Sequence, residues 1–462
     1  MKKYLITNAL LINEGQTKPS DVLIAGERIE RIGNEISDAN AQVIDFQGNY
    51  LIPGMIDDQV HFRDPGLTYK ADIHTESKAA VAGGITSFMD MPNTIPNTLT
   101  RALLEEKYQL AAQKSLANYS FFMGVTASNL EEALRVDNES VCGITDDGLY
   151  LEKQEILANN PEYLEKLFSR AETLVALHSE DDSVIRRNLQ QYQQAYGDQI
   201  PIALHPAIRS SEACETATRR VLDIQKKYNN RLHFFHISTA AEAKLFSSGP
   251  IEKKRVTAEA CIHHLCFNDA DYENLGSKIM WNPSVKSEVD RLELLKALQD
   301  GRLDIIATDH APHSLEEKTG NYLQIKSGAP MVQHAILMLL ELVGRGELAL
   351  TTLVDKTSHR VADCYKMVDR GYIREGYFAD LVEVAPSAPW EVKTQSLLYK
   401  CGWSPAVGRR FSHQIKRTFV SGNLCFQGGK FTNGSAPLVP SAAVRALPPW
   451  RCWTATKPRA TS

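Results

Sequence analysis

Residues 85–125 contain three patterns in succession, I-T-S-F-M-D-M (85–91), T-R-A-L-L-E-E-K-Y-Q-L-A-A-Q-K-S-L (100–116) and Y-S-F-F-M-G-V (119–125). The first and last patterns are apolar runs of strand length, whereas the middle one has the apolar spacing of a helix. A strand, a helix and a second strand in this order predict one βαβ unit, and the same alternation continues along the chain.

Further apolar runs follow the same rule. They include T-L-V-A-L-H-S (173–179), L-H-F-F-H-I-S-T (232–239), K-R-V-T-A-E-A-C-I (254–262) and L-D-I-I-A-T-D-H-A (303–311). About eight repeats of strand and helix favour an α/β fold of the TIM-like (β/α)8 barrel type. An open α/β sheet stays as the alternative.

The two ends of the chain differ from this central region. Residues 1–52 contain short alternating runs separated by Gly and Asn turns, and the same texture returns over 377–433. We expect both segments to form one small β-sandwich domain beside a barrel over 53–376. The remaining stretch, 434–462, is rich in Pro, Ala and Ser, and we expect an irregular tail without a function.

Composition excludes several classes of partner. The net charge is only −5, so no polyanion is implied, and we expect no nucleic-acid partner. The chain carries no Asp or Glu after Glu391, so a basic arm for an anionic partner is the alternative to an irregular tail. No apolar run is long enough to span a bilayer, so we expect no membrane partner. The eight Cys form no C-x-x-C pairs, which is typical of reduced thiols in a cytoplasmic protein.

Side chains that bind metals stand at the ends of several apolar runs. They are His61, Asp147, His178, His236 and Asp309. Because active sites of such barrels collect where the strands end, these side chains are expected to converge. Imidazole and carboxylate suit Zn²⁺, and two such ions bridged by a carboxylate would activate water. Each residue taken alone has a structural alternative, either a hydrogen-bonded His or an Asp in a turn.

Several longer motifs add a resemblance to a known family. They are D-D-Q-V-H-F-R-D-P-G (57–66), M-P-N-T (91–94), T-D-D-G (145–148), L-H-S-E-D (177–181), F-H-I-S-T (235–239), W-N-P-S-V-K (281–286), A-T-D-H-A-P-H (307–313) and G-Y-F-A-D-L-V (376–382). With these motifs in this order, the chain resembles dihydroorotases of the amidohydrolase superfamily, in particular the free-standing bacterial enzymes.

The resemblance implies a role for each metal ligand. His61 and Asp309 would hold the more buried ion, Asp147 would bridge, and His178 and His236 would hold the second ion. Asp309 would also act as general base and then as general acid.

The resemblance also implies a substrate site. Arg63, Asn93 and His313 would bind the substrate carboxylate, and Asn282 would contact the ring amide. A bidentate guanidinium suits a planar carboxylate, which is a separate reason to expect Arg63 there. The implied reaction is the reversible hydrolysis of dihydroorotate to N-carbamoyl-aspartate in pyrimidine synthesis. Homodimers are common among such enzymes, so a homodimer is one possible assembly.

One position departs from the family pattern. The first metal strand normally reads H-x-H, but Gln59 stands two residues before His61. Strand alternation points both side chains the same way, and an amide oxygen is a poor zinc ligand. Three outcomes stay open: two ions with the first weakened, one ion at His178 and His236, or no catalysis.

Two other functions therefore remain as alternatives. One is a catalytically silent, dihydroorotase-like scaffold, for instance a partner of aspartate transcarbamoylase, and its support is Gln59. The other is a cyclic amidase of the hydantoinase or dihydropyrimidinase type, against which Arg63 argues because those rings need no carboxylate clamp. His263 and His264 also follow an apolar run, and we expect them to be structural or to support the metal ligands.

Overall fold

The computed structural model describes residues 2–136, 141–149 and 157–432. The irregular tail expected at 434–462 lies outside these residues.

Eight parallel strands form a barrel in the order of the chain. They are β6 (Met55–Val60), β7 (Ile85–Asp90), β8 (Asn118–Gly124), β9 (Gly143–Thr145), β10 (Val175–Leu177), β11 (Leu232–Phe234), β12 (Val256–Cys261) and β13 (Ile305–Ala307). The last strand meets the first through a bridge between Val60 and His310, and the His61 N–H donates to the His310 carbonyl at 2.7 Å. The strand residues are buried except for Val256 at the start of β12, as expected for a parallel sheet covered by helices. The TIM-like barrel predicted from the sequence is confirmed.

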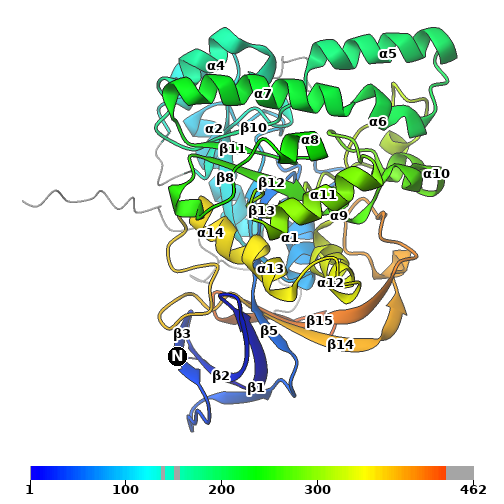
Figure 1. Ribbon diagram of the computed structural model, residues 1–462. Coiled ribbons are helices and arrows are strands. Elements are labelled where there is room, and N and C mark those ends of the chain that lie inside the picture. Colours follow the sequence, from blue (N-terminus) through cyan, green and yellow to red (C-terminus); the bar gives the residue numbers. More distant parts are fainter. Residues whose placement is uncertain (1, 137–140, 150–156, 433–462) are drawn as a thin grey trace, which may run out of the picture.

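Helices connect the strands and cover the outside of the barrel (Figure 1). They are α1 (Ile73–Ala82), α2 (Arg101–Lys114), α3 (Leu130–Ala133), α4 (Pro161–Phe168), α5 (Asp182–Tyr196), α6 (His205–Ile208), α7 (Ser211–Tyr228), α8 (Ala240–Ala243), α9 (Ile262–Cys266), α10 (Tyr272–Leu275), α11 (Glu288–Gln299), α12 (Ala335–Gly344), α13 (Leu350–Val354) and α14 (Arg360–Cys364). Several of the longer helices begin at a capping side chain. Thr100 caps α2 by accepting from the Leu103 N–H, and Ser287 and Asp290 form a capping box on α11.

The two ends of the chain form a second, separate sheet below the barrel in Figure 1. Its strands are β1 (Lys3–Asn13), β2 (Gln16–Ala25), β3 (Arg28–Gly33), β4 (Gln42–Asp45), β5 (Tyr50–Pro53), β14 (Leu381–Glu391), β15 (Arg410–Val420), β16 (Asn423–Gln427) and β17 (Lys430–Phe431). Antiparallel pairing of β14 with β5 joins the ends, and Leu381 lies opposite Pro53. An apolar core that includes Tyr4, Phe46 and Phe419 fills this part. The β domain expected from both ends of the chain is confirmed.

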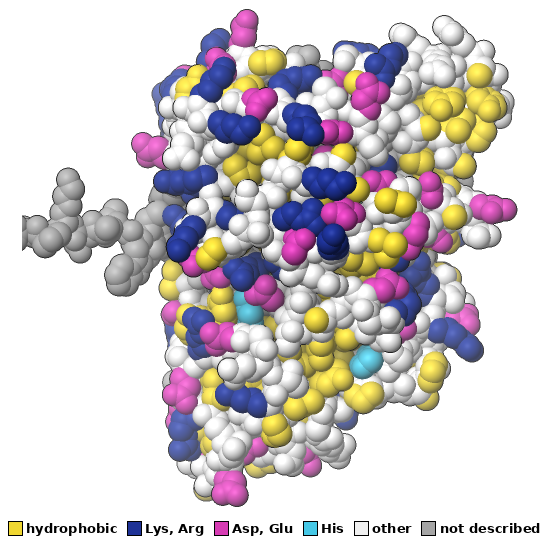
Figure 2. Space-filling model, in the orientation of Figure 1, with side chains coloured by type: hydrophobic (Ala, Val, Ile, Leu, Met, Phe, Trp, Pro, Cys, Tyr) yellow, Lys and Arg dark blue, Asp and Glu magenta, His cyan; other side chains and the backbone are white. Residues whose placement is uncertain are grey.

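The surface shown in Figure 2 carries charges of both signs interspersed, with apolar side chains between them. The described helices include none with the length and apolar character that crossing a membrane requires.

Candidate active site

Three ligand atoms lie at the spacing that a tetrahedral metal ion requires. His178 Nδ1 and His236 Nε2 are 3.0 Å apart, and each lies 3.6 Å from Asp147 Oδ1. Ligands at about 2.0–2.1 Å from a tetrahedral zinc ion would lie about 3.3 Å from one another. The residues follow β9, β10 and β11, so three neighbouring strands place one ligand each. This set fits a zinc ion with small adjustments.

Glu180 determines which nitrogen of His178 faces this position. His178 Nε2 lies 2.8 Å from Glu180 Oε2, and Arg209 pairs with the same carboxylate. The Nε2–H therefore donates to Glu180 and leaves Nδ1 toward Asp147, as in the carboxylate–histidine arrangements common at zinc sites. The sequence motif L-H-S-E-D contained Glu180, but its role was not recognised because the contact depends on the side-chain conformation.

His61 and Asp309 lie on the other side of Asp147. His61 Nδ1 donates to Asn93 Oδ1 at 2.8 Å, so its Nε2 presents a lone pair. That Nε2 lies 3.2 Å from Asp309 Oδ1 and 3.5 Å from Asp147 Oδ2. A lone pair among carboxylate oxygens requires a proton or a cation, so this position also suits a metal ion.

Gln59 interrupts this second position. Its side-chain Nε2 donates to Asp147 Oδ2 at 3.2 Å, and its Oε1 accepts from Cys261 Sγ at 3.4 Å. The amide thus directs an N–H group, and not its oxygen, toward Asp147. An N–H group at this point disfavours a cation between Asp147 and His61.

Backbone conformation is unusual at several of these residues. Arg63, His236 and Asp309 have positive φ values of 66°, 38° and 45°. Such a conformation is uncommon for residues other than glycine and costs about 1–3 kcal/mol each. Surrounding contacts hold the latter two: the His236 N–H donates to Glu259 Oε1 at 3.1 Å, and Trp281 Nε1–H donates to the Asp309 carbonyl at 3.1 Å.

The charges of the metal-free site are strongly coupled. Burial opposes ionisation of Asp147, but hydrogen bonds from His178 and His236 prevail and hold its pKa well below its usual range. Burial likewise opposes protonation of His178, but Asp147 and Glu180 prevail and raise its pKa to about 9. In the absence of metal, His178 therefore carries a proton at neutral pH that a metal ion would have to displace.

A small pocket opens onto these groups. It is lined by His61, Arg63, Asn93, Asp147, Gly148, Trp281, Asn282, Asp309, Ala311, Ser327 and Gly328. Its cavity volume is about 30 Å³, so it is narrow in this conformation.

Arg63 provides the positive charge of the pocket. Its side chain is buried, and Nε donates to the Pro312 carbonyl at 3.2 Å while a terminal nitrogen donates to His313 Nε2 at 3.3 Å. His313 does not line the pocket but contacts Arg63 from behind. Asn282 contributes a buried Oδ1 that has no hydrogen-bond partner in the described part of the chain, which leaves an acceptor for a ligand N–H.

Glu317 connects this clamp to the loop that follows it. Its carboxylate lies 3.1 Å from His313 Nδ1, accepts from Lys70 Nζ at 3.1 Å and accepts from Tyr69 Oη at 2.8 Å. The Ser314 N–H also donates to it, at 3.0 Å. Glu317 therefore ties the loop before Gly328 to the segment that follows Arg63. Sequence reasoning missed this residue because no motif pointed to its partners.

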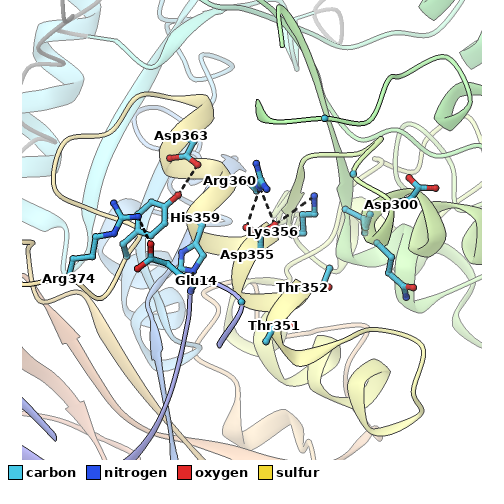
Figure 3. A pocket seen from close by; sticks show the side chains of 16 residues that line it. Glu14, Asp300, Thr351, Thr352, Asp355, Lys356, His359, Arg360, Asp363 and Arg374 are labelled. Atoms are coloured by element: carbon cyan, nitrogen blue, oxygen red, sulfur yellow. Dashed lines mark hydrogen bonds and ion pairs between the residues drawn. The ribbon is translucent and has the colours of Figure 1, made fainter. Parts of the chain in front are cut away.

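A larger cavity of about 630 Å³ lies elsewhere (Figure 3). It is bordered by the segments that lead into β12 and β13, so it lies at the opposite end of the barrel from the metal ligands. Its charged side chains pair with one another: Arg374 with Glu14, and Arg360 with Asp355. His359 bonds the Gly371 carbonyl at 2.6 Å. Among the described residues, these pairs already occupy four of its charged side chains.

The predicted site residues thus occupy one region at the carboxyl ends of the strands. Asp147, His178 and His236 form one cluster, His61 and Asp309 extend it, and the pocket joins Arg63, Asn93 and Asn282 to it. His313 reaches this region through Arg63.

Comparison with known proteins agrees with this geometry. Residues 50–425 match the model of the Amidohydrolase family. The dihydroorotase of Carboxydothermus hydrogenoformans is 30% identical over 426 residues, covering 91% of this chain and 96% of that protein. The dihydroorotase of Clostridioides difficile is 30% identical over 431 residues, covering 91% of this chain and 99% of that protein.

Solved structures with the same fold include two cyclic amidases. The L-hydantoinase (dihydropyrimidinase) from Arthrobacter aurescens has a TM-score of 0.86 at 23% identity and covers 93% of this chain and 97% of its own. This likeness concerns the fold alone. The dihydropyrimidinase from Brevibacillus agri has a TM-score of 0.82 at 26% identity and covers 93% of this chain and 96% of its own. By the match over most of its length and by its relatives, the chain belongs to the amidohydrolase family.

Proposed function

We propose that the protein is a metal-dependent dihydroorotase. It would reversibly hydrolyse the ring amide of (S)-dihydroorotate to N-carbamoyl-L-aspartate in pyrimidine biosynthesis. Relatives that carry the name dihydroorotase align with nearly the whole chain. The observation that carries the proposal is Arg63, a buried guanidinium in the same pocket as His61, Asp147 and Asp309.

Arg63 distinguishes between cyclic amides. Its guanidinium has five N–H donors, and the contacts with Pro312 and His313 use only some of them. The remaining N–H groups can donate to a ligand. Dihydroorotate carries a carboxylate on its ring, whereas hydantoins and dihydropyrimidines need none. A buried positive charge without a ligand carboxylate is costly, so its place in the pocket favours an anionic substrate.

The donor set supports zinc as the metal. Asp147, His178 and His236 would hold one ion, and His61 with Asp309 and Asp147 would hold a second, weaker one beside Gln59. When bound, zinc lowers the pKa of water and polarises the amide carbonyl.

Asp309 moves the protons of the reaction. Its carboxylate accepts a proton from the attacking water and then donates it to the ring nitrogen as the carbon–nitrogen bond breaks. The hydrogen bond from Trp281 Nε1–H to the Asp309 carbonyl holds its backbone in place. One water is consumed, and the nitrogen leaves as part of the carbamoyl group.

The remaining residues orient the substrate. Asn93 lines the pocket and fixes the ring of His61. His313 supports Arg63 on the carboxylate side. Asn282 Oδ1 accepts from the ring N–H. These assignments place the carboxylate near Arg63 and the scissile amide near Asp147 and Asp309.

The experiment is turnover of dihydroorotate by purified protein, before chelation, after chelation and after zinc is restored. Zinc-restorable turnover supports the proposal. Turnover of a hydantoin or dihydropyrimidine alone would favour another cyclic amidase. Bound zinc without turnover of any of these would favour a silent scaffold, such as a partner of aspartate transcarbamoylase.

A further inference from the structure

A second group of metal-binding side chains lies at the end of β12. Cys261, His263 and His264 are all buried, and each offers a ligand atom within 4.8 Å of the other two. None of the three belongs to the Asp147, His178 and His236 cluster. The group combines one thiol and two imidazoles, a donor set that zinc prefers over harder cations.

The hydrogen bonds of this group are incomplete. Neither Nδ1 nor Nε2 of His263 has a hydrogen-bond partner among the described residues, and neither does Nδ1 of His264. His264 Nε2 lies 3.1 Å from the Pro283 carbonyl, so it carries the proton and Nδ1 presents a bare lone pair. Buried polar atoms of native proteins nearly always have a partner, which can be an ion absent from the coordinates.

The rings of His263 and His264 are held by packing, but this packing provides no hydrogen-bond partners for their free nitrogens. His263 stacks flat on Trp281, with ring centres 4.1 Å apart and an angle of 2° between the planes. Its centre lies 4.0 Å from that of His264. The stacking explains why the ring of His263 is buried. It does not explain the unpaired nitrogens.

We propose that Cys261, His263 and His264 bind a zinc ion at a site separate from the catalytic one. His264 would coordinate through Nδ1, His263 through one ring nitrogen, and Cys261 through its sulfur. Binding forms the zinc–sulfur bond and releases the thiol proton to solvent. The three ligand atoms, all within 4.8 Å of one another, would have to move somewhat closer together to hold the ion.

The position of the group connects it to the reaction. Cys261 contacts Gln59 Oε1, and Trp281, which covers His263, lines the substrate pocket. An ion there would hold Gln59 and Trp281 in their present places. The inference nevertheless stands on the side chains alone and does not depend on the proposed substrate.

The test uses the full-length protein stripped of metal and reloaded with Co²⁺ alone. Thiolate ligation to Co²⁺ produces a near-ultraviolet charge-transfer absorption, which imidazole and carboxylate ligation do not. We expect this absorption in the unaltered protein, and its loss with one fewer ion per chain in Cys261→Ser. Cys425→Ser, which changes a buried thiol in the small β domain, should keep both.

Three results would overturn the proposal. The first is saturation with Co²⁺ and no such absorption in the unaltered protein, which needs no variant to fold and would assign a buried water to the unpaired nitrogens. The second is an unchanged ion count in folded Cys261→Ser. The third is loss of the absorption in Asp147→Asn, because the two sites would then not be separate. Dihydroorotate turnover, measured on the same samples, reports on the proposed function independently.

Discussion

The side-chain amide of Gln59 donates a hydrogen bond to Asp147 Oδ2 across 3.2 Å. The other oxygen of Asp147 faces His178 and His236 at 3.6 Å from each. Asp147 thus accepts a hydrogen bond from Gln59 through one oxygen and directs its other oxygen toward the two histidines. An N–H group repels a cation, so we expect the position beside Gln59 to bind a metal ion more weakly than the position at His178 and His236.

Replacing Gln59 with His should increase metal binding. An imidazole presents a lone pair where the amide presents a proton, and imidazole is a better zinc ligand than an amide. We expect Gln59→His to retain up to one more zinc ion per chain than the unaltered protein, measured by elemental analysis after identical dialysis.

Cys261 contacts Gln59, so the same comparison is made in a Cys261→Ser background. The gain should persist there, because the added ligand faces Asp147. An unchanged zinc count in both backgrounds would contradict the unequal positions inferred from the amide.

The sequence predicted the main features of the site for a simple physical reason. Parallel strands end at one edge, so ligands that follow separate apolar runs must converge. This reasoning placed His61, Asp147, His178, His236 and Asp309 together without any knowledge of distances. The barrel itself was predicted separately, from the repeated alternation of strand-like and helix-like runs.

What the sequence could not show depends on side-chain direction. Gln59 is visible as a departure from the family pattern, but which atom of its amide faces Asp147 depends on Cys261, more than two hundred residues later. Glu180 and Glu317 were missed because single hydrogen bonds give them their roles. The unpaired nitrogens of His263 likewise appear only in three dimensions.

Arg63→Lys should weaken the use of dihydroorotate. Lysine keeps the charge but loses the fork that matches a carboxylate. A lost hydrogen bond between charged groups costs about 1.5–3 kcal/mol, so kcat/KM should fall roughly tenfold to a hundredfold. The same ring without its carboxylate is the control substrate, and an equal loss of activity toward it would contradict the assignment.

Zinc binding to the metal-free protein should strengthen as pH rises. His178 has a pKa raised to about 9 from 6.5, so its proton is present below that pH and must leave when zinc binds. The apparent association constant should rise roughly tenfold per pH unit up to about that value, for one displaced proton. Competition with a chelator at several pH values measures this.

Glu180→Gln provides the matched comparison, because Glu180 helps to raise the pKa of His178. In this variant the apparent association constant for zinc should stop rising at a lower pH than in the unaltered protein. An identical pH dependence in both proteins would remove Glu180 from this role.

Glu317→Gln should loosen the loop that closes the pocket. The carboxylate accepts hydrogen bonds from Tyr69, Lys70 and the Ser314 N–H. The neutral amide of Gln has only one acceptor oxygen, so it would replace some of these hydrogen bonds with weaker ones. We expect faster tryptic cleavage at the exposed Lys326 and a KM for dihydroorotate raised roughly tenfold, the equivalent of about 1.4 kcal/mol. Glu316→Gln makes the same charge change at an exposed neighbour and should leave both measurements unchanged. Equal effects of the two variants would assign the change to net charge.

Lys107→Met should strongly destabilise the barrel. Lys107 Nζ lies 2.7 Å from Asp90 Oδ2, both side chains are 1% exposed, and Nζ also donates to the Met91 carbonyl at 2.7 Å. Removing one partner leaves an uncompensated buried charge, which costs about 3–5 kcal/mol.

The damage should reach the active site, because Asp90 Oδ1 accepts from the Phe62 N–H at 2.7 Å, and Phe62 lies between His61 and Arg63. Lys227→Met is the control: its partner Glu165 is also 2.7 Å away, but the two side chains are 61% and 39% exposed. Water can replace that partner, so the loss of unfolding free energy should stay at or below about 1 kcal/mol. Denaturant unfolding of both variants measures the difference, and comparable losses would mean that burial does not determine the strength of the Asp90 pair.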